Sequence, residues 1–195
     1  EGIVIRFEFS DPILNAVETD MGEAVIPRVL GDTPLLRAGA PDVSKVDATV
    51  IIDAASGTAL EVIDVEFQDI PNVEVAPSKG NLYRNVTPAD VPFEQGAVYG
   101  QDQFYPAQVA SLQSPFVQRG VRGQSVWAFP FQYNAVTNVL RSHSSITVRI
   151  VNNETTAVNP AVAPVRVTAE FADQLGRRFL NASSGDSRYD YIEEH

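Results

Sequence analysis

The chain has 195 residues, of which 44% are hydrophobic, and this length and composition predict one domain with a buried core. Its 14 basic and 25 acidic residues give a formal net charge of −11. That balance argues against nucleic acid as a partner, because phosphates require clustered lysine and arginine, and against an anionic membrane surface. The chain has no cysteine, which excludes disulfides, thiolate metal sites and a cysteine nucleophile within it. No apolar run approaches the ~20 residues of a membrane-spanning segment.

Alternation of apolar and polar residues predicts β-strands along most of the chain. Residues 3–9 (IVIRFEF) place four apolar side chains on one face and Arg6 and Glu8 on the other, which is the pattern of a half-buried strand. Residues 124–131 (QSVWAFPF) predict a more apolar strand, in which Pro130 marks an edge or a bulge because proline cannot donate a hydrogen bond. The other segments with strand-like alternation are residues 48–52, 63–67, 146–150 and 165–169.

Turns and one helix complete the expected fold. The chain contains 13 prolines and 12 glycines, spread evenly between the strand-like segments, as is typical of a sandwich with many connections. Only residues 171–180 have helical spacing, and the side chains along one stripe are Phe171, Leu175, Arg178 and Phe179. We therefore predict an all-β fold, an antiparallel β-sandwich with one short C-terminal helix.

Residue types able to catalyse a reaction are scarce. His195 is the last residue, and His143 precedes the strand at 146–150, where we expect it on the surface. A Ser/His/Asp triad through His143 stays open as an alternative, although the chain has no Gly-x-Ser-x-Gly motif. The scattered carboxylates lack the spacing of a calcium loop or another metal site: Asp20, Glu23, Asp42 and Asp47. We therefore expect neither a metal nor another cofactor.

Arginines in predicted loops are the remaining candidates for function. Arg84 lies in residues 76–88 (APSKGNLYRNVTP), which contain two prolines and one glycine. Arg119 lies in residues 118–123 (QRGVRG), and Arg188 follows a small, polar stretch near the end of the chain. Taken singly, each of these arginines has the character of a solvated surface charge.

Several short motifs follow one another in an order that is more informative than any one of them. They are GAP at 39–41, APSKG at 76–80, YGQDQFYP at 99–106, RGVRGQ at 119–124, QYN at 132–134 and VLR at 139–141. Over nearly the whole chain, this series resembles the N-terminal prodomain of the gingipains, the caspase-like cysteine peptidases of family C25. It is most similar to the Arg-specific gingipains. Two positions depart from the family: Ala135 stands where proline is usual, and His143 where tyrosine is common.

The resemblance implies a prodomain that helps its peptidase to fold and keeps it latent by covering the active site. Its partner would be the cognate caspase-like cysteine peptidase domain. The prodomain itself would be no enzyme, although the full precursor would be a cysteine endopeptidase whose nucleophile lies downstream. Family members are exported by the type IX secretion route, which implies passage through the periplasm to the cell surface or the extracellular space.

The same resemblance implies an inhibitory residue. In the Arg-specific members, an arginine on a prodomain loop enters the primary specificity (S1) pocket of the peptidase. The matching residue is Arg84, and Arg119 is the second choice. A planar guanidinium can pair with a pocket carboxylate through two parallel hydrogen bonds, which lysine cannot reproduce.

The end of the chain resembles the family's junction with the mature peptidase. In the family, a short helix ends near an asparagine, and an Arg-Tyr pair then opens the mature domain; the corresponding pair is Arg188-Tyr189. We therefore expect a prodomain at residues 1–188 and the start of the mature peptidase at residues 189–195. Processing is expected first after Arg188 and later after Arg84.

Two readings from other classes remain open. One is a non-catalytic β-sandwich module for adhesion or carbohydrate binding, because a fold alone does not decide function. This reading gives Arg84 no role and predicts that the isolated chain binds a carbohydrate or surface ligand. The other is an enzyme built around His143. A caspase-like domain encoded after His195 would favour the prodomain over both.

Overall fold

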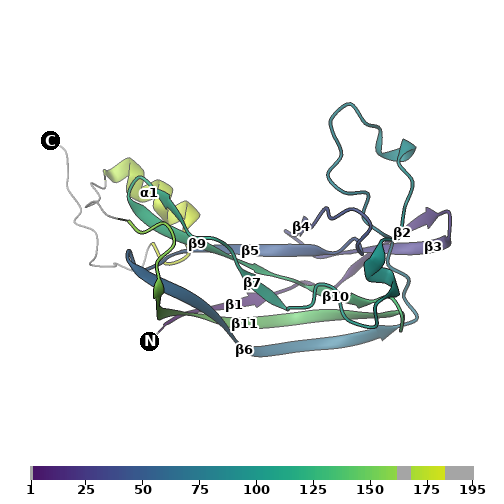
Figure 1. Ribbon diagram of the computed structural model, residues 1–195, viewed down its shortest axis with the longest axis horizontal. Helices are drawn as coiled ribbons and strands as arrows, with labels where there is room; N and C mark the ends of the chain where they lie inside the picture. Colours follow the sequence, from purple (N-terminus) through teal and green to yellow (C-terminus); the bar gives the residue numbers. More distant parts are fainter. Residues whose placement is uncertain (1, 162–167, 183–195) are drawn as a thin grey trace.

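Two antiparallel β-sheets packed face to face form the body of the protein, and a short helix lies against one end (Figure 1). The computed structural model describes residues 2–161 and 168–182. The predicted all-β sandwich with a short C-terminal helix is confirmed. Two short 3-10 helices, η1 (Pro88–Asp90) and η2 (Ala97–Gly100), lie in the long connection between the sheets.

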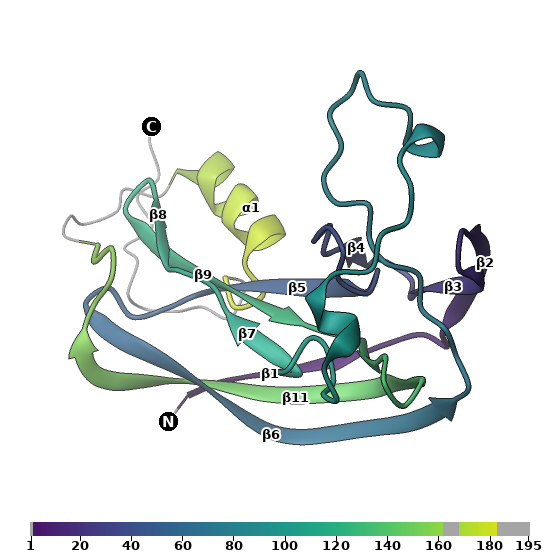
Figure 2. The same cartoon turned by 45° about the vertical axis from the view of Figure 1, so that its right-hand side comes forward.

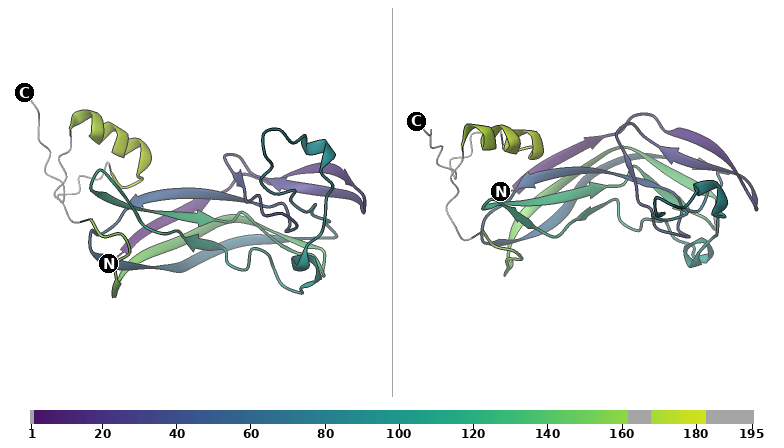
Figure 3. Two further views of the ribbon diagram at one scale, coloured as in Figure 1. Left: turned by 45° about the horizontal axis from the view of Figure 1, so that its top comes forward. Right: turned by 90° about the horizontal axis from the view of Figure 1, so that it is seen from above.

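The first sheet is centred on the long strand β11. Its members are β1 (Gly2–Glu8), β6 (Ser56–Pro71), β10 (Phe131–Asn134) and β11 (Val139–Thr156). β6 pairs along one edge of β11, and β1 and β10 pair in succession along the other. Register shifts interrupt the β6–β11 pairing at three places, and such bulges bend a strand. Figure 3 shows the strands of the body arched from end to end.

The second sheet carries the helix. Its strands are β4 (Thr33–Pro34), β5 (Ser44–Ile51), β7 (Ala110–Leu112), β8 (Phe116–Gln118) and β9 (Val121–Ala128). β5 and β9 pair without a register shift from Val46↔Ala128 to Ile51↔Gly123. Successive side chains of these two strands therefore alternate regularly between the core and the outer face of this sheet.

A separate two-stranded hairpin lies beside the end of the sandwich. It consists of β2 (Ile13–Thr19) and β3 (Gly22–Arg28), which pair with each other. β3 is also tied to the chain that leaves β6, because Val25 donates its N–H to the Glu74 carbonyl oxygen at 2.8 Å and accepts from Ala76 N at 2.9 Å. The hairpin is thus anchored along one strand only.

Apolar side chains from both sheets form the main core. The strands β1 and β11 contribute from one side, and β5 with the residue after it, β7 and β9 from the other. The eleven buried members are Ile5, Phe7, Ala48, Val50, Ile52, Ala110, Val126, Ala128, Ile146, Val148 and Ile150. A second cluster around Phe131, Tyr133 and Leu140 fills the end of the sandwich near the hairpin. Burial of these alternating side chains supplies the main driving force for folding.

The strand predicted at 124–131 is divided between the two sheets. β9 ends at Ala128 in the second sheet, and β10 begins at Phe131 in the first. Pro130 marks the end of the strand as predicted, and its carbonyl oxygen accepts a hydrogen bond from His143 N at 2.9 Å. The single-strand prediction was wrong because both halves are apolar, so the sequence pattern does not reveal the change of sheet.

The helix α1 (Ala169–Arg178) begins and ends near its predicted limits. Thr168 caps it by accepting a hydrogen bond from Phe171 N at 3.3 Å. Phe171, Leu175 and Phe179 are buried against the second sheet, whereas Arg178 is exposed at the edge of that stripe. Residues 165–167 of the last predicted strand lie outside the described residues, and Ala169 is helical.

No helix in the described part of the chain is long and apolar enough to cross a membrane.

Candidate functional site

The most prominent feature outside the sandwich is a long loop that rises from the body (Figure 2). We call residues 79–96, which include η1, the arginine loop. Arg84 takes the second position of a β-turn in this loop, where Val86 N donates to the Tyr83 carbonyl oxygen at 3.0 Å. Arg84 is exposed, and Tyr83 beside it is 82% exposed. Among the ion pairs of the described residues, none involves Arg84.

Close backbone contacts hold the two ends of the arginine loop together. Gly39 donates its N–H to the Ser78 carbonyl oxygen at 2.9 Å, and its own carbonyl oxygen accepts from Gly96 N at 2.7 Å. A Cβ at Gly96 would lie 2.9 Å from the Gly39 oxygen, and a Cβ at Gly80 would lie 2.9 Å from the Ala38 Cβ. Gly39 and Gly80 also have φ angles of 73° and 81°, which favour glycine. We call Gly39, Ser78, Gly80 and Gly96 the neck.

Lys79 braces the arginine loop just above the neck. Its Nζ donates a hydrogen bond to the Pro88 carbonyl oxygen at 2.8 Å, which ties the rising arm to the returning one. The same Nζ lies 4.1 Å from the centroid of the Phe93 ring, close enough for a cation–π interaction. The loop therefore has a defined shape before any partner binds, which lowers the entropic cost of binding.

The chain just before the neck is anchored in the protein interior. Val75 and Ala76 are fully buried, and Tyr99 donates its hydroxyl to the Val75 carbonyl oxygen at 2.7 Å. Burial raises the pKa of Tyr99, so its hydroxyl remains a donor at any physiological pH. Ser78 N donates to the Ala40 carbonyl oxygen at 2.7 Å, which fastens the APSKG motif to the GAP motif. Both motifs are recognisable in the sequence, but their contact is not, because they are far apart in the chain.

Arg119, the second choice for the inhibitory residue, lies at the opposite end of the molecule. It occupies the turn between β8 and β9 with φ 49°, and it is exposed. Its Cζ lies 5.2 Å from the centroid of the Phe171 ring in α1. Figure 2 shows β8 beside α1, away from the arginine loop. The structure therefore does not bring Arg84 and Arg119 together. Arg188 and Tyr189 lie outside the described residues.

Arg122 from the same glycine-flanked motif has a structural position. Its side chain is 1% exposed, and its guanidinium donates to four backbone carbonyl groups, those of Asp53, Ser56, Val158 and Asn159. Burial lowers the pKa of Arg122, and the nearby Asp53 opposes this effect. The side chain joins two connecting segments and is unavailable to a partner.

His143 is buried, which contradicts its predicted position on the surface. It is 1% exposed, its ring meets Phe67 edge to face at 6.0 Å, and its Nδ1 lies 3.3 Å from the Pro130 carbonyl oxygen. Burial lowers the pKa of His143. Its Nε2 has no hydrogen-bond partner among the described residues. The crossing between sheets at Pro130 covers this ring, and no serine or carboxylate of the described residues completes a triad with it.

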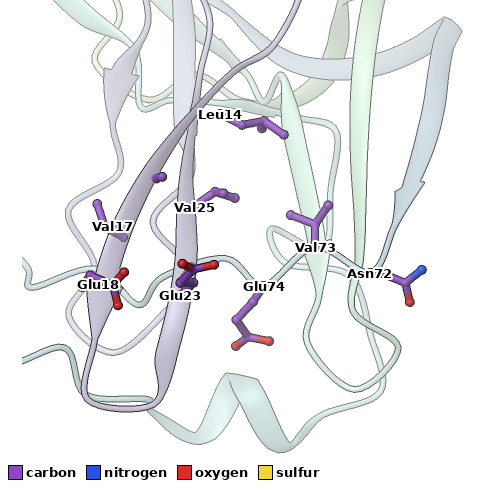
Figure 4. A pocket seen from close by; sticks show the side chains of 10 residues that line it. Leu14, Val17, Glu18, Glu23, Val25, Asn72, Val73 and Glu74 are labelled. Atoms are coloured by element: carbon purple, nitrogen blue, oxygen red, sulfur yellow. The ribbon is translucent and has the colours of Figure 1, made fainter.

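A pocket of about 420 Å³ lies between the hairpin and residues 72–74 (Figure 4). Apolar side chains such as Leu14, Val25 and Val73 line it, and Glu18 and Glu23 stand directly opposite each other in the hairpin register. Two like charges in this arrangement repel. The described residues contain no group of three or more His, Cys, Asp or Glu side chains able to hold a metal ion. This pocket therefore has the chemistry of an acidic surface hollow.

The fold and the loop together define a β-sandwich that presents one arginine on a braced projection. Residues 1–165 match the profile of the Propeptide_C25 family. The chain belongs to this family, the propeptides of the gingipain peptidases.

Named relatives and solved structures agree with this assignment. Gingipain R1 of Porphyromonas gingivalis is 33% identical over 97% of this chain, and gingipain R2 of strain W83 is 29% identical over 97%. The chain spans 19% and 26% of the length of these two relatives. The structure is similar to a chain in the complex of Porphyromonas gingivalis RgpB pro- and mature domains, with a TM-score of 0.86, 28% identity and 92% coverage of both chains. A gingipain K structure solved to explain zymogenic latency has the same fold, with a TM-score of 0.65, 22% identity and coverage of 78% of this chain and 87% of that one.

Proposed function

We propose that this chain is the prodomain of a secreted, gingipain-like cysteine peptidase and keeps that peptidase latent by inserting Arg84 into its S1 pocket. The observation that carries this proposal is the exposed Arg84 on a turn whose supporting loop is closed by the neck and braced by Lys79. A pseudo-substrate needs this combination, because the side chain must be free while the backbone that presents it is fixed. Membership of the propeptide family supports the same function.

Arginine suits this role through its geometry. A pocket carboxylate can accept two parallel hydrogen bonds from the planar guanidinium, and both groups lose water when the pocket closes. Tyr83, which is 82% exposed beside Arg84, would then lie on the peptidase surface next to the pocket. Exposed tyrosine and arginine are the residue types that dominate the energetics of interfaces.

The test is inhibition of the mature peptidase domain of the same precursor by this chain and its Arg84→Ala variant. Loss of one partner of a buried charge pair costs about 2–5 kcal/mol. At about 1.4 kcal/mol per decade, the inhibition constant should rise roughly thirty- to several-thousand-fold. The Arg84→Lys variant should lie between the two.

Arg119→Ala is the matched control, because Arg119 is also an exposed arginine in a turn. It should inhibit like the unchanged chain. If Arg84→Ala inhibits normally and Arg119→Ala does not, Arg119 is the inhibitory residue. If the chain does not inhibit at all but binds a carbohydrate, the adhesion module is the better assignment.

We also propose that the precursor is processed at the Arg188–Tyr189 bond, with the prodomain at residues 1–188 and the mature peptidase starting at Tyr189. A peptidase specific for arginine would accept Arg188 on the acyl side of the scissile bond, and a later cut after Arg84 would break the loop and release the peptidase. N-terminal sequencing of the mature enzyme tests the junction. A mature chain that begins elsewhere, or an Arg188→Ala precursor that matures normally, would contradict it.

The prodomain would also help its peptidase to fold, because a tethered domain that binds only the folded partner stabilises it by mass action. Precursors with and without residues 1–188 should therefore differ in the yield of active peptidase. Export through the periplasm to the cell surface or the medium belongs to the same proposal, and detection of the precursor in those fractions tests it.

A further inference from the structure

The outer face of the second sheet has two projections, one at each end. α1 packs on this face through Ile51 and Val121, and a Cβ on Gly123 would collide with the Phe179 ring. Figures 1 and 2 show α1 and the arginine loop rising from the same side of β5, at opposite ends. A partner that receives Arg84 and lies between the two projections would cover this face.

Trp127 points to that same face. Gly123 and Trp127 are four residues apart on β9, and the uninterrupted β5–β9 register keeps alternate residues on one side. Val126 and Ala128, its neighbours in sequence, are buried in the core between the sheets. Trp127 is the only tryptophan of the chain, and it is only partly buried.

A pocket of about 490 Å³ opens at Trp127. Its walls are mostly apolar and aromatic, and we call it the tryptophan pocket, with Leu35, Tyr105, Pro106, Ala107, Trp127 and Phe129 as its main lining residues. An aromatic floor with apolar walls can bury one large apolar side chain of a partner. Such a pocket at an interface is the usual place for a residue that contributes much of the binding energy.

Two cations stand at this pocket although the chain is strongly acidic. Lys45 Nζ lies 3.4 Å from the centroid of the Trp127 ring, and Arg37 lines the pocket and is exposed. Among the ion pairs of the described residues, none involves either of them. Asp47 stands opposite Trp127 in the β5–β9 register and offsets part of this charge, but the two cations outnumber it, in a chain whose formal net charge is −11. Charge complementarity therefore favours a carboxylate next to the apolar side chain that enters.

The tryptophan pocket is joined to the base of the arginine loop. Arg37 lines the pocket, and its carbonyl oxygen accepts a hydrogen bond from Ala40 N at 3.1 Å. Gly39, between these two residues, closes the neck by bonding to both ends of the loop. The same short segment thus forms a wall of the pocket and the support of Arg84.

We propose that the tryptophan pocket is a second docking point for the peptidase domain and receives one apolar side chain flanked by a carboxylate. This inference rests on the proposed function, because it names a further surface for the same partner. The loop would occupy the specificity pocket, and the tryptophan pocket would hold the peptidase surface beside it.

The single tryptophan provides a direct probe. The chain labelled with 5-fluorotryptophan has one ¹⁹F resonance, and an unlabelled, catalytically inactive peptidase domain adds none. On titration of the peptidase, the chemical shift of this resonance should change until one equivalent has bound. An unchanged resonance in a complex that demonstrably forms would overturn the proposal.

Arg84→Ala separates this inference from the proposed function. If both ideas hold, the labelled Arg84→Ala chain binds more weakly, and its resonance still reaches the same end point at saturating peptidase. If Arg84→Ala binds and inhibits normally while the resonance shifts, the proposed role of Arg84 fails and the pocket remains. If Arg84→Ala weakens inhibition but the resonance of the bound wild type is unmoved, the pocket proposal alone fails.

A filling substitution tests the contribution to affinity. Ala107→Phe occupies the pocket from an exposed position and should raise the inhibition constant roughly thirtyfold or more, the range of an interface hot spot. Ala16→Phe is the matched control, because it places the same side chain in the acidic hollow of the hairpin and should have no effect. Equal inhibition by folded Ala107→Phe and wild type would contradict the proposal; if Ala107→Phe does not fold, the fluorine experiment on the unsubstituted chain decides.

The cations can be tested in the same assay. Lys45→Gln and Arg37→Gln should each weaken inhibition, and the loss should shrink as salt is added. Arg6→Gln, a change of the same kind on β1 in the other sheet, should have no effect. An equal response of all three variants would remove the electrostatic part of the argument.

Discussion

Arg84 and Arg122 show how differently the two ends of this molecule use one residue type. Both have glycines nearby in the sequence, but Arg84 lies in a loop and Arg122 near the start of β9. At the end with α1, Arg122 is 1% exposed, and backbone carbonyl oxygens surround its guanidinium. At the other end, Arg84 is exposed on a projection that is itself held by hydrogen bonds. One arginine stabilises the fold, and the other is the residue for which we propose a partner.

The difference lies in where the hydrogen-bond donors are used. Arg122 uses its donors within the protein, joining the connection after β5 to the segment that follows β11. Hydrogen bonds from the backbone groups of Gly39 and Gly96 and from the ammonium group of Lys79 hold the arginine loop in shape. No ion pair of the described residues involves Arg84, as its proposed insertion into a pocket requires. A loop can present an unpaired charge only when other groups maintain its shape.

The largest effects should come from replacing these two arginines by alanine, because one change should reduce stability and the other should weaken inhibition. Arg122→Ala removes five hydrogen bonds from a buried charged group to backbone carbonyls, and such bonds contribute about 1.5–3 kcal/mol each. We expect the free energy of unfolding to fall by about 3 kcal/mol or more, as measured by urea denaturation. Arg84→Ala should leave it unchanged and affect inhibition alone. An Arg122→Ala protein as stable as the wild type, or a destabilised Arg84→Ala protein, would contradict these different roles of the two arginines.

Two glycine substitutions should have smaller effects, one mainly on inhibition through the arginine loop and the other on the stability of the body. Gly80→Ala puts a Cβ 2.9 Å from Ala38 Cβ at a φ of 81°, so the neck must shift, at a cost of about 1–3 kcal/mol. We expect inhibition to weaken roughly 5- to 100-fold, with a much smaller change in the melting temperature. Gly176→Ala in α1 meets no atom within 4 Å and should stabilise the protein by about 0.5–1 kcal/mol without changing inhibition. The opposite pattern would show that the neck does not shape the loop.

His143 should produce the smallest effect, visible only as a pH dependence. Burial lowers its pKa from 6.5, so the unfolded chain binds the proton more tightly than the folded one. Stability is therefore full above about pH 6.5 and decreases as the pH falls from there towards the lower pKa of the folded state. Asp11, Asp69 and Arg141 lie around this ring. A hydrogen bond from Arg141 lowers the pKa of Asp69, so Asp69 affects stability only at a more acidic pH than His143 does.

Urea denaturation at pH 5 to 8 measures this effect, and His143→Gln should remove the decrease below about pH 6.5. A parallel decrease in both proteins would assign the pH dependence to other groups. Inhibition at neutral pH should be the same for both, since His143 is buried within β11.

Local features of the fold could be read from the sequence. The alternation at residues 3–9 and 146–150 matches the paired strands β1 and β11, with Ile5, Phe7, Ile146 and Val148 in the core. The spacing of Phe171, Leu175 and Phe179 predicted the buried stripe of α1. Turn-forming residues around Arg84 predicted an exposed loop, and Arg84 is exposed. These features depend on neighbours within a few positions, so a periodic pattern is enough to reveal them.

Other features needed contacts between distant segments. The apolar run at 124–131 could not show that the chain changes sheets at Pro130, and this crossing is what buries His143. Arg119 and Arg122 could not be told apart in sequence, because only the carbonyl groups of far segments decide which one is enclosed. The neck exists because Gly39 meets Ser78 and Gly96 across the fold. Sequence periodicity determined which segments are strands and which are loops. Tertiary packing decided which polar groups are buried, because burial depends on which distant segments of the chain pack against them.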